Sequence, residues 1–317
     1  MHLALNSQLS TLNFPKGRAG LSSGRRDPAR LLDCLMFGFR PSDFFRSSTF
    51  GLRTSSFWLL LACALVFSPL TSGASPAYLF SYFTGNGEDG LHLAWSTNGY
   101  HWEALKSGRS FLAPEVGESK LMRDPCLLLA PDQTFHMVWT TSWAGKTIGY
   151  ASSKDLVHWS PQKALPVMAD EPATLNCWAP EVFWDATKQQ FVIFWASTVT
   201  NRFRETAGQA ERNYNHRIYA TTTKDFKAFT PTRLFYDPGF NVIDATMLAA
   251  QGRFYLIFKD ETLHPVRKHL RLAVADSPEG PFGSPAPAIT QSWVEGPTAL
   301  RVGDDYVVYF DCYRDHH

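Results

Sequence analysis

Short apolar runs alternate with turn residues along the chain from Ala77 onward, and no stretch keeps a helical period. The runs are rich in β-branched and aromatic residues, and Gly, Pro, Asn and Asp bound them, as is typical of β-strands. Five of these runs are aromatic and similar to one another, and they cover residues 77–83, 134–139, 190–195, 253–258 and 305–310. The pattern predicts an all-β domain over residues 77–317.

A second kind of strand ends in a small polar turn that an aromatic residue follows. These strands cover residues 91–97, 148–153, 217–222 and 270–275, and the aromatic residues are Trp102, Trp159, Phe229 and Phe282. A third kind is an apolar run headed by an acid, at Asp124, Glu181, Asp244 and Glu295, and these acids are 57, 63 and 51 residues apart. Four strands that recur every ~50–60 residues indicate a β-propeller, whereas a β-sandwich requires no such period.

The repeat predicts a five-bladed propeller whose last blade is incomplete. Residues 77–105 form a first unit without an inner strand, and the last unit starts near Val294 and reaches His317 after two strands. A propeller ring is closed when one end of the chain adds a strand to the sheet at the other end. Here that strand is missing, so we expect a C-terminally truncated domain with exposed strand edges.

Residues 1–76 are predicted to be a leader with a secretory signal peptide. An apolar run of eleven residues, Phe57–Phe67, follows two arginines and precedes small residues that permit cleavage after Ala74. Eleven residues are fewer than the ~20 that a transmembrane helix needs. We expect a secreted or periplasmic protein, with Met36 as an alternative start. An uncleaved anchor and a lipoprotein modified at Cys63 are the competing interpretations.

Composition and charge narrow the function classes. Charged residues make up 19% and aromatic residues 14% of the 317 residues, a mix that argues against disorder and coiled coils. The formal net charge is +1, but residues 1–76 carry eight Lys and Arg against three Asp, so residues 77–317 carry about −4. An acidic body gives no electrostatic reason to expect nucleic acid as a partner. We predict a monomer that meets a membrane only through its leader.

The cysteines predict neither a disulfide framework nor a zinc site. Cys34 and Cys63 belong to the leader, which leaves Cys126, Cys177 and Cys312 in the body. Three cysteines cannot all pair with one another, and their spacing matches no zinc motif. We therefore expect buried, inert thiols and no metal site.

The acids at the strand starts predict a catalytic site. Inner strands of a propeller line its axis, so acids that head successive inner strands converge in one funnel. Several carboxyl groups at close range raise the pKa of at least one of them. A protonated carboxyl group that faces an ionised one across a small pocket is what glycoside hydrolysis needs, because one protonates the leaving oxygen and the other activates water. The alternative for each acid is a structural role at the start of its strand.

Four motifs occur in the order in which glycoside hydrolase family 43 has them, and the chain resembles that family over residues 77–317. The motifs are Arg123-Asp-Pro125, Trp178-Ala-Pro-Glu181, Val242-Ile-Asp-Ala245 and Val294-Glu-Gly-Pro297. The resemblance implies that Asp124 is the general base, that Glu295 is the general acid, and that Asp244 tunes the pKa of that acid and orients it. It also implies a five-bladed propeller that hydrolyses α-L-arabinofuranosides, β-xylosides or galactans of plant-type polysaccharides with inversion, without a required cofactor.

Other residues are predicted to contact the sugar. Trp178 and Trp143 are candidates for stacking on a sugar ring, although most tryptophans here are expected in blade packing. His216 and Arg217 follow a polar loop and are candidates for contacts with hydroxyl groups, although an exposed loop histidine is more often solvated. We interpret Glu181 as a pocket-wall or structural carboxylate without a catalytic role. Relatives often carry a histidine beside a bound calcium in the fifth blade, a region missing here, so structural calcium has no support.

Three alternative functions stay open. A fructosidase propeller also has an Arg-Asp-Pro motif, but its acid is followed by Cys, whereas Glu295 is followed by Gly296. A sialidase is suggested by residues 96–102, which resemble an Asp-box, although no cluster of three arginines can be inferred. A non-catalytic carbohydrate-binding propeller would keep the blades and the aromatic residues without paired acids. The sequence leaves the sugar, the linkage and the choice between exo and endo cleavage open.

Overall fold

Strands form nearly all of the regular structure in the computed structural model, which describes residues 3–4 and 77–314. In chain order they are β1 Leu3–Ala4, β2 Tyr78–Tyr82, β3 His92–Ser96, β4 Glu103–Ala104, β5 Arg123–Leu129, β6 Phe135–Thr140, β7 Ile148–Ser153, β8 Lys163–Leu165, β9 Trp178–Asp185, β10 Gln190–Thr198, β11 His216–Thr223, β12 Arg233–Tyr236, β13 Val242–Ala250, β14 Arg253–Asp260, β15 His269–Ala275, β16 Val294–Val302 and β17 Asp305–Cys312. The described residues include three short 3-10 helices, η3 Leu105–Gly108, η4 Arg204–Thr206 and η5 Glu211–Asn213. Within these ranges no helix is long and apolar enough to cross a membrane. The predicted signal peptide lies outside the described residues.

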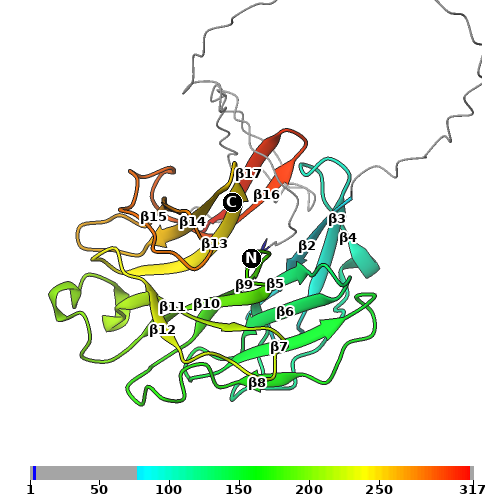
Figure 1. The fold of residues 1–317 in the computed structure, drawn as a ribbon, viewed down its shortest axis with the longest axis horizontal. Helices are drawn as coiled ribbons and strands as arrows, with labels where there is room; N and C mark the ends of the chain where they lie inside the picture. Colours follow the sequence, from blue (N-terminus) through cyan, green and yellow to red (C-terminus); the bar gives the residue numbers. More distant parts are fainter. Residues whose placement is uncertain (1–2, 5–76, 315–317) are drawn as a thin grey trace, which may run out of the picture.

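Hydrogen bonds join the strands into five antiparallel sheets (Figure 1). From the inner strand outward the sheets are β1–β4, β5–β8, β9–β12, β13–β15 and β16–β17. The inner strands of consecutive sheets contact one another, β5 with β9, β9 with β13, and β13 with β16. The all-β, propeller-like fold is confirmed, and the five sheets, the last of them two-stranded, fit the five predicted blades.

Consecutive sheets pack face to face, and each pair encloses its own apolar core. On β10, Phe191, Ile193 and Trp195 belong to the core shared with the second sheet, while Val192 and Phe194 belong to the core shared with the fourth. Side chains alternate along a strand, so a sheet that lies between two others must be apolar on both faces. This requirement explains the unbroken apolar runs in the sequence.

The first and last sheets also pack against each other. Phe80 and Tyr82 of β2 share a buried cluster with Leu300 and Val302 of β16. The two residues of β1 pair with β2 on its inner side. Among the described residues, side-chain packing connects the first sheet to the last.

A hydrogen-bonded turn after the third strand recurs in the first three sheets. In the second sheet, Ser153 Oγ accepts from the backbone N–H of Leu156 at 2.8 Å, and Asp155 Oδ1 accepts from those of Val157 and His158 at 2.9 and 2.7 Å. The same pairs of side chains are Ser96 with Asn98 and Thr223 with Asp225. The residues that resemble an Asp-box are therefore a repeated turn of the fold, and they give no support to a sialidase.

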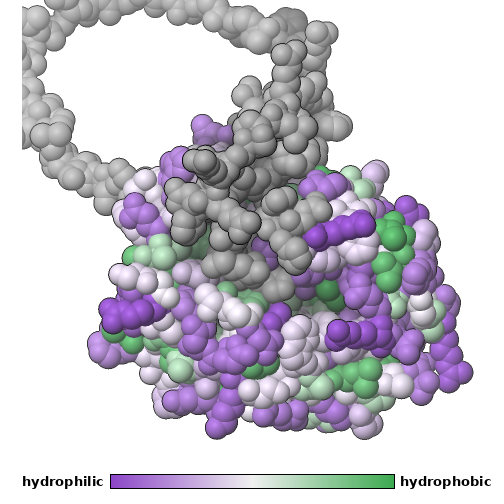
Figure 2. Space-filling view, turned by 180° about the vertical axis from the view of Figure 1, so that it is seen from behind, coloured by the Kyte–Doolittle hydropathy of each residue, from purple (hydrophilic) through white to green (hydrophobic). Residues whose placement is uncertain are grey.

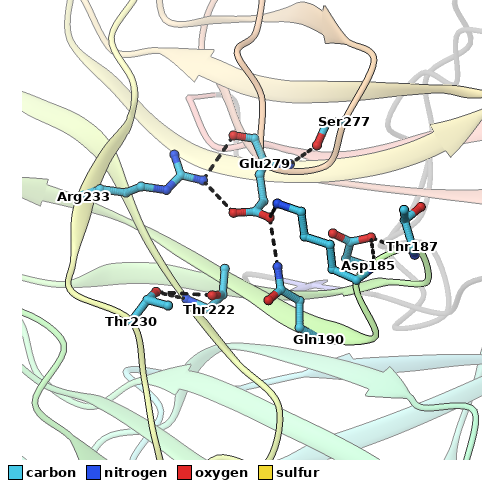
Figure 3. Close-up of polar contacts among 9 residues, drawn as sticks. Asp185, Thr187, Gln190, Thr222, Thr230, Arg233, Ser277 and Glu279 are labelled. Atoms are coloured by element: carbon cyan, nitrogen blue, oxygen red, sulfur yellow. Dashed lines mark hydrogen bonds and ion pairs between the residues drawn. The ribbon is translucent and has the colours of Figure 1, made fainter.

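Polar contacts connect the third sheet to the loop that follows β15 (Figure 3). Glu279 accepts hydrogen bonds from Lys188 Nζ at 2.6 Å and from Gln190 Nε2 at 2.9 Å. Arg233 Nη2 donates to the backbone oxygen of Glu279 at 3.1 Å. Glu279 thus accepts at its carboxylate from β10 and the turn before β10, and at its backbone oxygen from β12.

Large apolar side chains concentrate between the sheets rather than on the surface. The face seen in Figure 2 is largely hydrophilic with small apolar spots. The exposed large apolar residues are scattered along the chain: Trp95, Tyr100, Leu129, Trp143, Val157, Leu175, Phe229, Leu234 and Val266. Trp143 is the member of this group that also lies at the cavity described below.

The cysteines differ from the prediction in one respect. Cys126 and Cys177 are buried thiols that form no disulfide, as expected. Burial raises the pKa of the Cys177 thiol to about 12, so this thiol is inert at neutral pH. Cys312 is disulfide-bonded, which corrects the expectation of three free thiols.

Replacing Phe80 by alanine tests the packing between the first and last sheets. Phe80 is 3% exposed, and its ring packs edge-on against Trp102 and Tyr309, with centroids 4.8 and 6.0 Å away. The cavity left by the variant should lower the free energy of unfolding by about 3–5 kcal/mol. Urea denaturation measures the loss, with Phe229→Ala, which removes a ring that is 37% exposed, as the matched control. Equal losses in the two variants would show that this contact does not hold the ring together.

Candidate active site

A cavity of about 260 Å³ opens where the inner strands β5, β9, β13 and β16 begin. Its lining comes from these strand starts and from two loops: Arg123, Asp124, Thr140, Trp143, Trp178, Glu211, Arg212, Tyr214, His216, Ile243, Asp244, Glu261 and Glu295. The three predicted catalytic acids Asp124, Asp244 and Glu295 therefore share one cavity. Trp143, Trp178 and His216, which were predicted to contact the sugar, line it as well.

Each of these four inner strands carries a β-bulge at its start. In β5, Arg123 pairs with Thr140 and Cys126 pairs with Val138, so three steps along β5 match two along β6. The same shift separates Trp178 from Glu181, Ile243 from Thr246, and Glu295 from Thr298. Bulges bend a strand and redirect its side chains, and they are common beside active sites.

One residue of each bulge has a left-handed backbone. These residues are Asp124, Ala179, Asp244 and Gly296, with φ of 49°, 44°, 51° and 57°. Among residues with a side chain, aspartate tolerates this conformation comparatively well, and glycine adopts it freely. The bulge therefore favours Asp or Gly at this position, and in β5 and β13 the aspartate carboxylate enters the cavity.

The four acids consequently do not occupy equivalent positions, as their spacing had suggested. Asp124 and Asp244 are the left-handed residues of their bulges, and Glu295 is the residue before the left-handed Gly296. Glu181 lies two residues after its left-handed residue, in register with Cys126 and Thr246. That register places Glu181 below the cavity rather than in its lining.

Glu181 is a buried structural acid. It is 6% exposed, does not line the cavity, and accepts a hydrogen bond from Thr246 Oγ1 at 3.1 Å. Desolvation raises the pKa of Glu181 to about 8, against the opposing effect of hydrogen bonds from Thr246 and Cys126. Glu181 is thus protonated at neutral pH and links three blades around the axis. Of the two roles expected for Glu181, the structure fits the structural one and does not place this residue in the lining of the cavity.

Asp124 is oriented by a relay from the next blade. Thr140 Oγ1 donates to Asp124 Oδ2 at 2.9 Å and itself accepts from the backbone N–H of Ala179 at 2.8 Å. The bulge of β9 thereby fixes a hydroxyl group, and that hydroxyl fixes one oxygen of the carboxylate. Asp124 is half-buried, and its side chain lines the cavity.

Asp244 and Glu295 are connected through the backbone of the last sheet. Asp244 Oδ2 accepts from the backbone N–H of Gly296 at 3.1 Å. This bond fixes the residue that follows Glu295 and hence the direction in which Glu295 leaves the strand. Lys259 Nζ lies 2.8 Å from Glu295 Oε2, so a buried cation contacts the predicted general acid directly.

Aromatic rings form another part of the cavity wall. The ring of Trp178 lies between Trp143 and Tyr214, with centroids 5.6 and 4.8 Å away. Trp143 Nε1 donates to Asn86 Oδ1 at 2.9 Å and Trp178 Nε1 donates to the Trp143 backbone oxygen at 3.0 Å. Because both indole N–H groups are used in this way, the two rings are fixed and offer apolar surface to a ligand.

His216 is a buried residue of β11 and not an exposed loop residue, which corrects one of our assumptions. Asn176 Nδ2 donates to His216 Nε2 at 2.8 Å, and the ring lies beside Trp178 at 4.9 Å. Desolvation, together with the nearby positive charges of Lys259, Arg217 and Lys268, lowers the pKa of His216 to about 3. A neutral imidazole therefore lines the cavity, suited to hydrogen bonding and not to charge pairing.

Arg217 does not reach the cavity. Its side chain is fully buried, forms an ion pair with Asp237, and donates to Asn215 Oδ1 and Thr206 Oγ1 at 3.0 Å. The guanidinium group also lies over the ring of Phe203 at 4.2 Å. Arg217 therefore braces the loop before β11. The alternation of side chains along a strand explains why only one of the neighbours His216 and Arg217 faces the cavity.

Comparisons with known proteins decide which family carries this arrangement. The family model described as "Probable glycosyl hydrolase domain", related to glycoside hydrolase family 43, matches residues 74–316. The chain belongs to this family. An α-L-arabinofuranosidase of Bifidobacterium longum subsp. longum is 31% identical over 88 residues, which cover 26% of this chain and 8% of that protein.

Solved structures support the fold of this glycosyl hydrolase domain. An exo-β-1,3-galactanase from Phanerochaete chrysosporium matches with a TM-score of 0.56 at 14% identity, over 77% of this chain and 55% of that chain. A xylan β-1,4-xylosidase from Bacillus halodurans C-125 matches with a TM-score of 0.52 at 14% identity, over 73% and 46%. The chain thus spans about half the length of these two proteins and a far smaller share of the curated relative.

Several cavity residues of the glycosyl hydrolase domain were not predicted from its sequence. Arg123 is buried, stacks between Phe83 and Trp143 at 4.8 and 4.2 Å, and donates to Asn86 Oδ1 at 3.0 Å. Arg123 has the same place in its bulge as Glu295, one residue before the left-handed position, and this equivalence would have predicted that Arg123 lines the cavity. The other missed residues come from the loop before β11 and the end of β14: Glu211, Arg212, Tyr214 and Glu261.

The described part of the domain contains no group of three His, Cys, Asp or Glu residues arranged to hold a metal ion. The carboxylates of the cavity instead have hydroxyl, backbone and lysine partners.

Glu181→Gln tests the assignment of Glu181 as a protonated structural acid. The pKa of Glu181 in the folded state, about 8, exceeds that of an unfolded glutamate, ~4.3. The stabilisation of the folded protein by protonated Glu181 is therefore complete below pH 4 and is lost as the pH rises towards 8. The glutamine variant cannot lose a proton, so its stability relative to wild type should improve by on the order of 1–3 kcal/mol between pH 5 and pH 8. Urea denaturation at both pH values measures this change.

Glu103→Gln is the control for this experiment, because Glu103 is an exposed acid of β4. Its stability relative to wild type should stay constant between the two pH values. If the free energy of unfolding changed equally in Glu181→Gln and in wild type between pH 5 and pH 8, Glu181 would be ionised in the folded protein.

Proposed function

We propose that the chain is a glycoside hydrolase that cleaves terminal α-L-arabinofuranosyl or β-xylosyl residues from plant-type oligosaccharides or polysaccharides. The observation that carries this proposal is the convergence of Asp124, Asp244 and Glu295 in one cavity beside a wall of aromatic rings. Carboxyl groups act on the glycosidic bond, while ring faces hold the apolar side of a sugar. The family match supports the same reaction class.

Each acid has a distinct task in the proposed reaction. Asp124 takes a proton from a water molecule as the water oxygen attacks the anomeric carbon. Glu295 gives its proton to the leaving glycosidic oxygen as the bond to that oxygen breaks. Asp244 keeps the strand start that carries Glu295 in place through the N–H of Gly296. One water molecule is consumed, and the configuration at the anomeric carbon is inverted because a single displacement takes place.

The size of the cavity favours a terminal sugar as the substrate. About 260 Å³ is below the ~300–1,000 Å³ typical of sites that enclose drug-sized ligands, and it suits one or two sugar rings. The names of similar proteins include an arabinofuranosidase, a xylosidase and a galactanase, so a β-galactoside belongs in the substrate panel. The proposal includes export through the apolar segment at residues 57–67 and action as a monomer.

Two variants distinguish the acid from the base. Glu295→Gln should lose ~10²–10⁴-fold in kcat/KM on an alkyl or oligosaccharide glycoside, but much less on a 4-nitrophenyl glycoside, because nitrophenolate leaves without protonation. Asp124→Asn should lose similar factors on both substrates, because each needs activated water. Glu181→Gln, a carboxyl removal outside the cavity, is the matched control and should retain activity on both. Sugar binding without hydrolysis by the wild type would instead identify a binding module.

The stereochemical course is a separate test. Proton NMR spectra recorded during the first minutes of hydrolysis identify the anomer that is released before mutarotation. We expect the configuration opposite to that of the substrate, because Asp124 activates water and forms no covalent intermediate. Release of the retained anomer would assign Asp124 or Glu295 as a nucleophile and would reject the single displacement.

A further inference from the structure

Two buried lysines lie behind the part of the cavity wall that carries Glu295. Lys259 Nζ is 2.8 Å from Glu295 Oε2 and 2.7 Å from Glu261 Oε2. Lys268 Nζ forms an ion pair with Glu261 Oε1 and lies 3.3 Å from Glu211 Oε1. Carboxylates and ammonium groups therefore alternate along one wall, in the order Glu295, Lys259, Glu261, Lys268 and Glu211.

The strand pattern explains why Lys259 reaches Glu295. Lys259 is in β14 and pairs with Ile243, the residue before the left-handed Asp244. Side chains two residues apart on a strand share a face, and Ile257 packs against Ala299 and Tyr306 of the last sheet. Lys259 therefore faces the last sheet too, at the level where Glu295 begins its strand.

The burial of Lys259 has an electrostatic explanation. Lys259 is 1% exposed, and an isolated ammonium group in such a place is unfavourable. Desolvation lowers the pKa of Lys259, but the charges of Glu295, Glu261 and Asp244 outweigh it, so the pKa lies above its ordinary value. Lys259 is consequently a permanent cation in contact with one oxygen of Glu295.

We propose that Lys259 is a positioning residue that sets both the orientation and the protonation of Glu295. This inference rests on the proposed function, in which Glu295 is the proton donor. The ammonium group contacts Oε2 and thereby holds the carboxyl group of Glu295 in one direction. When Glu295 gives up that proton, Lys259 stabilises the carboxylate that forms. Glu261 shares the ammonium group and so limits its effect on Glu295.

Several charged or titratable groups face Glu295 from the elements around it. Lys259 and Glu261 approach from β14 and the residues after it, and Asp244 approaches from β13. Asp311 of β17 is the cross-strand partner of Glu295 in β16, and the centroid of the Tyr313 ring lies 4.6 Å from Lys259 Nζ. Lys259 is the cation in this set, so its removal should favour the protonated form of Glu295, whereas removal of Glu261 should favour the carboxylate.

The experiment compares wild type with Lys259→Met, Lys259→Arg, Glu261→Gln and Lys268→Met. Lys268 is the matched control because it is equally buried at 1% and also binds Glu261, but does not contact Glu295. Carbon-13 NMR of glutamate-labelled protein follows the titration of the Glu295 carboxyl group, whose signal is the one missing from Glu295→Gln. The alkaline limb of kcat/KM against pH gives the second readout.

In Lys259→Met we expect the midpoint of the Glu295 titration to rise by at least about one pH unit, and the alkaline limb of kcat/KM to move to higher pH by a similar amount. Lys259→Arg should keep both values near those of wild type, and Lys268→Met should shift them much less than Lys259→Met. Glu261→Gln should move both values to lower pH. A merely structural role cannot produce shifts of opposite sign in the two variants. Circular dichroism identifies variants that do not fold, and Glu261→Gln decides the matter if Lys259→Met is one of them.

The outcomes separate this inference from the function on which it rests. An unchanged Glu295 titration in Lys259→Met and Glu261→Gln would overturn the inference, whatever the activity. Wild-type protein that hydrolyses none of the glycosides would reject the proposed function, while the NMR titration still decides whether Lys259 controls the protonation of Glu295.

Discussion

The β-bulge at the start of each inner strand is the constraint on which the rest of the site depends. It adds one residue to the inner strand and forces one backbone into the left-handed region at Asp124, Ala179, Asp244 and Gly296. A non-glycine residue in this conformation is strained and persists only where its surroundings hold it. Here the Thr140 relay holds Asp124, and the Gly296 N–H holds Asp244. The bulge thus converts strands that pack a core into strands that present carboxylates.

Much of the fold could be predicted because packing between blades leaves a strong pattern in the sequence. A sheet enclosed on both faces needs continuous apolar strands, and the expected aromatic runs coincide with β2, β6, β10, β14 and β17 to within a few residues. Four acids were predicted to head inner strands and to meet in one funnel, and three of them lie in the cavity. Packing of the first sheet on the last was not predicted, because the pairing of strands at the ring ends says nothing about side chains such as Phe80 and Val302.

The errors at the site come from register, which spacing alone does not determine. Glu181 and Glu295 both head apolar runs, but one lies two residues after the left-handed position and the other one residue before it. A shift of a few residues moves a carboxyl group from the cavity to the packed region below it, where desolvation keeps it protonated. His216 and Arg217 differ for a similar reason, since neighbours on β11 point in opposite directions.

The unequal contributions of the strands give the cavity two chemically distinct sides. β5, β13 and β16 supply carboxylates, whereas β9 has Ala179 in the left-handed position and supplies Trp178 instead. The acid side is backed by the buried cation Lys259, and the aromatic side by neutral His216. A sugar ring has an apolar face and hydroxyl groups around its edge, so under the proposed function its apolar face would stack against Trp178 and Trp143 and its polar edge would point away from them. The bulge of β9 contributes no acid to the cavity, and the ring of Trp178 beside it supplies the apolar surface that such stacking requires.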